Sequence, residues 1–174
     1  MLDNEKSDNN YITHVAQRLV DNGYRIKQNV NYKQQIFRCV GKRNRFRLWP
    51  TSIEEIFVII TEFTSIDINV LDQFSFDCRK YAKRHRLVPY LALTGGVLCF
   101  PVAFSYDVDS NTERLLVSKD PFVGYGYTEM PAIVNLTNRT VSFSEQTPWL
   151  GLFFLDDARE ILNDLLHTWK DVEV

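Results

Sequence analysis

Residues 33–49, KQQIFRCVGKRNRFRLW, combine cationic and aromatic side chains as phosphate-binding surfaces do. Guanidinium and ammonium groups neutralise backbone phosphates, and Phe37, Phe46 and Trp49 could stack on unpaired bases. The stretch has six basic residues and no acidic one: Lys33, Arg38, Lys42, Arg43, Arg45 and Arg47. All of these except Lys33 are candidate nucleic-acid-binding residues.

The same charges have a second interpretation, in which they serve the protein itself. Arg25 and Lys27 extend the basic segment to eight residues, which leaves 12 basic against 22 acidic residues elsewhere. Such cations solubilise an exposed sheet face or edge, or pair with acids of the N-terminal segment such as Asp3, Glu5 and Asp8. Because the whole chain has a net charge of −2, general nucleic-acid binding is not favoured. A solvated or internally paired face is the main expectation.

Length and composition predict a single globular domain. The chain has 174 residues, 45% of them hydrophobic and 24% charged, which is enough to bury a core. The polar residues 1–9 are expected to form a flexible tail. Cys39, Cys78 and Cys99 are odd in number and have apolar neighbours, which favours buried thiols in a reducing compartment. The first ten residues do not resemble a signal peptide and no apolar run reaches membrane-spanning length, so we expect a cytoplasmic protein without a membrane partner.

Motifs for cofactors and metals are incomplete or missing in the sequence. There is no glycine-rich phosphate loop and no pair of cysteines or histidines at zinc spacing. Asp107, Asp109 and Asn111 begin like a calcium loop, but Thr112 replaces its glycine and Ser118 its final glutamate. We therefore expect no cofactor and a solvated acidic loop at this position.

Hydrophobic periodicity predicts the elements of the first half of the chain. A helical stripe runs from Tyr11 to Val20, with Asp8 or Asn9 as its cap and Gly23 as its stop. Three strands follow, over residues 24–32, 36–40 and 57–63. The first two are expected to form a hairpin, and the third is apolar on both faces, as a central strand is.

In the second half, a helix capped by Ser65 or Asp67 has a buried face from Val70 to Ala82. Its C-terminal end carries cations, where the helix dipole favours them. Further elements are strands at 90–93 and 97–104, at most one short helix within 106–121, a hairpin in 131–143, and a last helix with a stripe from Ala158 to Trp169. The predicted fold class is α+β, a mixed β-sheet flanked by helices in the order α-β-β-β-α-β-β-β-β-α.

The order of elements over residues 10–104 resembles that of the restriction-endonuclease-like nucleases. In that superfamily an acid from one strand and a Glu-x-Lys from the next hold magnesium and position the attacking water. The matching tripeptide here is Glu62-Phe63-Thr64, which lacks the lysine. The resemblance implies Glu62 and Glu55, with Glu54 as a second upstream acid, as metal-binding carboxylates, and Lys83 or Arg79 in place of the lysine. Alternatively, Glu62 is structural and pairs with an arginine.

A second resemblance lies near the C-terminus. The segment FSEQTPWLGLFF, residues 143–154, resembles a segment of small uncharacterised bacterial proteins, chiefly cyanobacterial. It implies no activity, and Trp149 and Phe153 are expected to anchor a turn before the last helix. With no complete catalytic set, the sequence predicts a non-enzymatic module that binds a macromolecule, either another protein or a second copy of the chain. The alternatives are a magnesium-dependent nuclease and an inactive nuclease-fold protein that binds nucleic acid.

Overall fold

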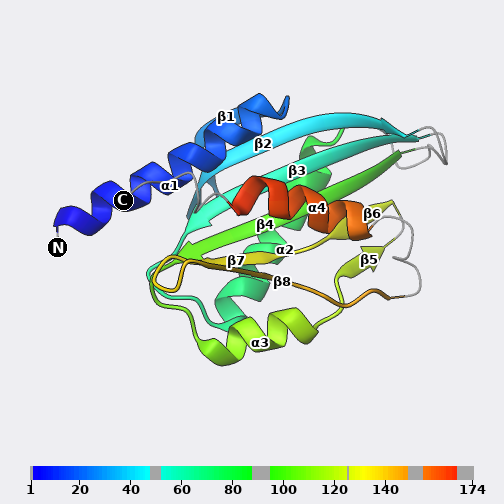
Figure 1. Cartoon of the computed structure of the whole chain (residues 1–174). Coiled ribbons are helices and arrows are strands. Elements are labelled where there is room, and N and C mark those ends of the chain that lie inside the picture. Colours follow the sequence, from blue (N-terminus) through cyan, green and yellow to red (C-terminus); the bar gives the residue numbers. More distant parts are fainter. Residues whose placement is uncertain (1, 48–51, 88–94, 125, 149–154, 168–174) are drawn as a thin grey trace.

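The computed structural model describes residues 2–47, 52–87, 95–124, 126–148 and 155–167. In these ranges, eight strands form one mixed sheet and four helices flank it (Figure 1). The predicted fold class, α+β with a mixed sheet flanked by helices, is confirmed. The strand order is β1-β2-β3-β4-β6-β5, and β7 continues beside β4 and pairs with β8.

Helix α1 (Leu2–Asp21) is longer than its apolar stripe. It begins at Leu2, so the predicted cap at Asp8 or Asn9 is wrong, and the expected tail is helical from residue 2 onward. Its end is as predicted: Gly23 has φ of 78°, and its N–H donates to the Val20 carbonyl at 2.9 Å. Glycine is suited to this position because it adopts positive φ without a steric penalty.

Strands β1 (Arg25–Tyr32), β2 (Gln35–Arg47) and β3 (Ser52–Glu62) pair antiparallel in sequence order. The predicted hairpin is confirmed, with β2 longer than expected. Helix α2 (Ile68–His85) starts at Asp67, whose carboxylate accepts the Val70 N–H at 2.8 Å. The chain then returns as β4 (Gly95–Ser105), parallel to β3. This pairing places β3 inside the sheet, as its apolar sequence predicts.

The last part of the chain extends the same sheet with short strands beside β4. Helix α3 (Ser110–Ser118) is capped by Asp109, so part of the calcium-like sequence forms a helix start. The remaining elements are β5 (Phe122–Gly124), β6 (Tyr127–Glu129), β7 (Ala132–Asn135), β8 (Thr140–Phe143) and α4 (Leu155–Leu166). The predicted hairpin is β7–β8. The predicted strand 90–93 and the predicted turn anchors Trp149 and Phe153 lie outside the described residues, as do Trp49 and Trp169.

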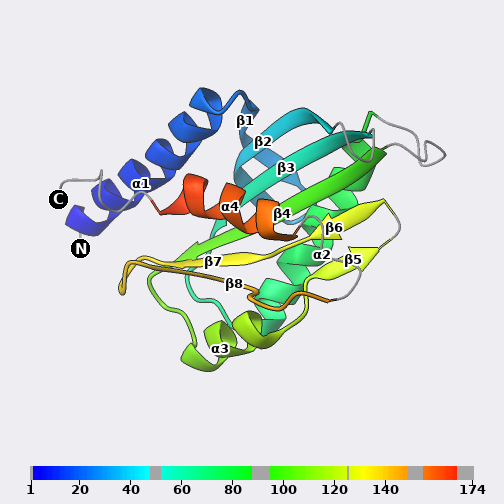
Figure 2. The ribbon, with the colours of Figure 1, turned by 45° about the vertical axis from the view of Figure 1, so that its right-hand side comes forward.

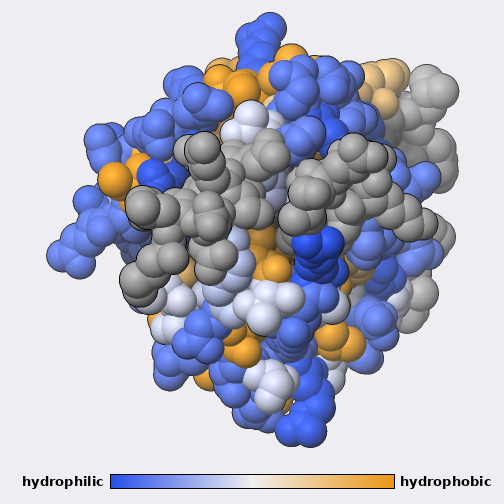
Figure 3. Space-filling model, turned by 60° about the vertical axis from the view of Figure 1, so that its left-hand side comes forward, coloured by the Kyte–Doolittle hydropathy of each residue, from blue (hydrophilic) through white to orange (hydrophobic). Residues whose placement is uncertain are grey.

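Two hydrophobic cores lie on opposite faces of the sheet (Figure 2). Helices α1 and α4 cover one face, where Leu19 and Leu162 are fully buried. Helices α2 and α3 cover the other face, where Phe74 and Leu116 are buried. The face drawn in Figure 3 is mostly hydrophilic, with hydrophobic residues in small separate areas. None of the described helices is long and apolar enough to cross a membrane.

The three cysteines are free and buried, as the sequence predicts. Burial raises the pKa of the Cys39 thiol to about 11, and raises those of Cys78 and Cys99 as well. Because the thiolate is the reactive form, all three thiols should resist Ellman's reagent in the native protein at pH 8 and react fully in denaturant. Fast reaction of any thiol without denaturant would contradict the burial of that cysteine.

Candidate functional site

The basic stretch does not form one cationic surface, because its side chains alternate between the two faces of β2. Lys42 lies on the α2 face, with its ammonium 4.9 Å from the centroid of the Phe57 ring. Arg45 lies on the α4 face and contacts Asp157 at 3.5 Å. A strand places successive side chains on opposite faces, so charges that adjoin in the sequence separate in the fold.

The cations of β2 also have partners within the protein. Arg45 pairs with Glu54 at 2.7 Å, and Lys42 pairs with Glu55 at 2.7 Å. Arg38 lies 3.6 Å from Glu62. Arg43 donates to the Asn22 carbonyl at 2.8 Å and stacks on Tyr24, and Lys33 pairs with Asp77. Arg47 ends β2, and its side chain lies outside the described part of the chain. This pairing supports the interpretation in which the cations serve the protein itself.

The structure does not bring Glu62, Glu55 and Lys83 together. Glu55 and Glu62 lie near opposite ends of β3, separated by about 23 Å at the usual rise of a strand. Glu55 is fully buried, whereas the Glu62 side chain is 34% exposed. Lys83 projects from α2, with its ammonium 5.1 Å from the centroid of the Tyr127 ring. In the described ranges, no three His, Cys, Asp or Glu side chains lie close enough to hold a metal ion.

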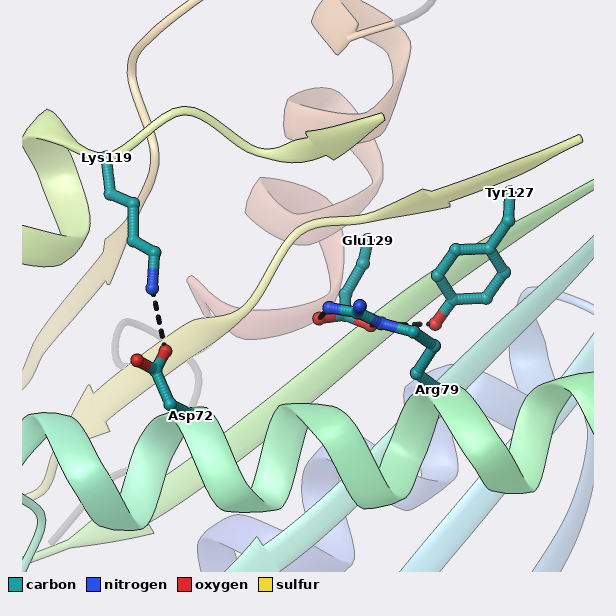
Figure 4. Close-up of polar contacts among 5 residues, drawn as sticks. All are labelled: Asp72, Arg79, Lys119, Tyr127 and Glu129. Carbon is teal, nitrogen blue, oxygen red and sulfur yellow. Dashed lines mark hydrogen bonds and ion pairs between the residues drawn. The ribbon is translucent and has the colours of Figure 1, made fainter. Parts of the chain in front are cut away.

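One cation of α2, Arg79, instead lies beside an acid that the sequence did not single out. Glu129, at the end of β6, is 2% exposed. Its carboxylate accepts Nε and Nη2 of Arg79, each at 3.0 Å, and the Tyr127 hydroxyl at 2.8 Å (Figure 4). Arg79 lies on α2, whereas Glu129 and Tyr127 lie on β6, so this cluster joins the helix to the sheet. The bidentate geometry is the strongest form of an arginine–carboxylate pair.

The electrostatics of this cluster favour a fixed ion pair. The hydrogen bonds from Arg79 to Glu129 raise the pKa of the guanidinium. Burial raises the pKa of the Tyr127 hydroxyl, which keeps it a neutral donor. With three donors on one carboxylate, Glu129 is well satisfied and is poorly suited to take a proton from a substrate. The cluster is therefore suited to holding a shape and presenting a guanidinium.

A groove of about 550 Å³ lies against this ion pair. One wall is a stripe along α2, formed by Ile68, Leu71, Asp72, Ser75, Phe76 and Arg79. The other wall is formed by Leu116 and residues 119–123. Lys119 and Asp72 join the two walls through a 2.7 Å ion pair between exposed side chains (Figure 4). The Phe122 ring lies over the Arg79 guanidinium, with the centroid 4.0 Å from Cζ.

The sequence carried only a weak signal for this site. Tyr127 and Glu129 alternate as strand residues do, but β6 has three residues, too few for a periodic pattern. Arg79 was visible as one of several cations near the end of a helix, where the helix dipole already explains their presence.

Comparison of the chain with known protein families, with curated proteins and with solved structures gives no match.

Proposed function

We propose that this protein is a non-enzymatic binding module that receives an extended segment of a partner protein in the groove beside α2. The observation that carries this proposal is the combination of a mostly apolar groove with a fixed guanidinium at one end. Binding sites commonly join apolar walls with a few well-placed polar groups.

The shape of the groove favours a chain segment over a compact ligand. Its lining positions on α2 run from Ile68 to Arg79, which corresponds to about 16 Å along the helix axis. An extended peptide of about five residues spans the same length. Apolar side chains of such a segment would pack on Phe76, Leu116 and Phe122, which form opposite walls.

The exposed guanidinium of Arg79, and not the net charge of the lining, favours a carboxylate at one end of the bound segment, because the lining also includes Asp72, Asp120 and Glu129. Glu129 is almost completely covered, whereas the Arg79 side chain is 26% exposed. Glu129 also lines the groove, but a ligand meets mainly the arginine because so little of the glutamate is exposed. Nε and Nη2 of Arg79 bind Glu129, which leaves Nη1 as a donor for a second carboxylate.

A peptide-display selection against the purified protein tests this proposal. Enriched peptides should combine large apolar residues with an acidic side chain or a free C-terminal carboxylate. Binding should be lost in Asp72→Trp, which fills the groove from an exposed position of α2. The matched control is Lys80→Trp, an exposed position on the same helix outside the groove lining. Peptides that bind Asp72→Trp as well as the unmodified protein, or a selection that enriches none, would overturn the proposal.

The magnesium-dependent nuclease stays a prediction of the resemblance, with its own test. Because Glu55 and Glu62 are far apart on β3, we expect no cleavage of supercoiled plasmid DNA by the protein with magnesium. Cleavage that disappears in Glu62→Ala would contradict this expectation and would favour the nuclease.

A further inference from the structure

A second depression, separate from the groove, lies between the β1–β2 turn and the first half of α2. Its volume is about 1060 Å³. It is lined by Lys33, Gln34, Gln35, Phe63, Asn69, Val70, Gln73, Phe74 and Asp77. None of these residues lines the groove beside α2, so the depression can be considered independently.

Carboxamide side chains are concentrated in this depression. Three of the six glutamines of the chain, Gln34, Gln35 and Gln73, line it together with Asn69. Each carboxamide offers two N–H donors and one carbonyl acceptor, so the depression has many uncharged hydrogen-bonding groups.

A buried carboxylate fixes the direction of two of these carboxamides. Asp77 is 5% exposed and accepts Nε2 of Gln35 at 3.0 Å and Nε2 of Gln73 at 3.1 Å, and it also pairs with Lys33. An ionised carboxylate only accepts hydrogen bonds, so each glutamine must direct its amino group toward Asp77. Its carbonyl oxygen then points away from Asp77 as an acceptor. In the described ranges, neither carbonyl oxygen receives a hydrogen bond.

The floor of the depression is apolar and partly aromatic. Phe74 is 1% exposed, and Phe63 meets it edge-to-face with the ring centroids 5.3 Å apart. Val70 lies beside them in the lining. A planar ligand would find an apolar surface below it and carboxamides around its edge.

We propose that this depression binds an adenine base, from a free nucleotide or from a single strand of nucleic acid. Asparagine and glutamine pair with adenine through its N6 amino group and N7, and the fixed carbonyl oxygens of Gln35 and Gln73 are suitable acceptors for N6. Phe63 and Phe74 supply the apolar contact for the ring. Lys33 uses one of its three N–H donors on Asp77 and can direct another toward a phosphate.

Titration of the ¹⁵N-labelled protein with AMP tests this site. Side-chain amide resonances of Gln35, Gln73 and Asn69 should shift, with saturation below about 5 mM. Gln73→Leu should weaken binding about tenfold, because it removes one hydrogen-bond acceptor of N6. Gln28→Leu, an exposed glutamine of β1 outside the depression, is the matched control. Asn69→Leu gives a second variant that leaves the contacts of Asp77 intact.

One further probe identifies the source of the base. An oligo(dA) strand that binds more tightly per site than AMP would assign the depression to nucleic acid, and equal affinity would assign it to free nucleotides. No amide shift with AMP, equal shifts in Gln73→Leu, or the same shifts with inorganic phosphate alone would each overturn the site. Asp72→Trp should leave AMP binding unchanged, so this result and the peptide selection can fail independently.

Discussion

Replacing Arg79 with methionine is expected to lower the free energy of unfolding by about 3 kcal/mol, because it leaves a buried carboxylate without its counter-ion. Methionine keeps much of the apolar stem of arginine, so lost packing contributes little. Glu129 would retain the Tyr127 hydroxyl at 2.8 Å as its remaining side-chain donor in the cluster. Urea unfolding of the variant and of the unmodified protein measures the difference.

The pH dependence of this loss separates charge from packing. In Arg79→Met, protonation of Glu129 stabilises the folded state, because the neutral acid needs no counter-ion. The folded variant then binds more protons than its unfolded chain as the pH falls, so the destabilisation should be smaller at pH 4 than at pH 7. A loss that is the same at both values would indicate that the guanidinium acts through packing alone.

Two further variants control this experiment. The double variant Arg79→Met/Glu129→Met should recover much of the lost stability, because apolar pairs of similar volume often replace a buried ion pair without loss. Arg84→Met, at an exposed position of the same helix, should change stability by less than about 0.5 kcal/mol. If the double variant is no more stable than Arg79→Met, the two residues are not coupled as the structure indicates.

Hydrophobic periodicity predicted the long elements because their buried faces repeat in the sequence. The apolar stripe of α2 and the alternation of β1 each extend over enough residues to be distinguished from chance. The N-terminal half of α1 has no such stripe in the sequence MLDNEKSDNN, which is why the sequence predicts a tail over residues 1–9.

Pro101, in the middle of β4, shows that the residues a strand tolerates depend on the hydrogen bonds of the neighbouring strands. Proline has no N–H to donate, which usually keeps it out of central strands. The carbonyl oxygens of Cys99 and Ser105 accept the backbone N–H groups of Met130 and Leu136. The backbone hydrogen-bonding groups of every second residue of β4 therefore face β6 and β7, and Pro101 is one of these residues. The ladder on that side is interrupted between Glu129 and Ala132, and Pro101 lies at this interruption. No pattern in residues 95–105 reveals that gap.

The candidate site was difficult to predict for a related reason. Which acid meets which cation depends on strand register and on the return path of the chain. Arg45 opposes Glu54 across the β2–β3 ladder, a pairing that follows only once the register is known. Glu129 meets Arg79 across 50 residues of chain, through a strand too short to predict. Arg79 is visible in the sequence as a helix cation, whereas its acidic partner is not.

Replacing Glu55 with alanine is expected to lower the free energy of unfolding by about 3 kcal/mol, whereas Glu62→Ala should cost less than about 1 kcal/mol. The carboxylate of Glu55 is fully buried, accepts the Leu87 N–H at 2.9 Å on both oxygens, and pairs with Lys42 at 2.7 Å. Its removal therefore leaves the Leu87 N–H without its acceptor and the Lys42 ammonium without its counter-ion, although the ammonium still donates to the His85 carbonyl at 2.8 Å. Within the described part of the chain, the one ion pair of Glu62 is a 3.6 Å contact with Arg38 between partly exposed side chains, and solvent screens such a pair.

Urea unfolding of the two variants side by side measures this contrast, with Lys42→Met as a third variant that removes only the cation. Equal small losses at both positions would contradict a structural role for Glu55 and would return it to the candidate metal ligands. The contrast also affects how any activity measurement is interpreted. If Glu55→Ala unfolds more easily, a loss of activity in that variant cannot be assigned to chemistry. The stable Glu62→Ala protein is therefore the sharper test of a nuclease, because its fold should be intact.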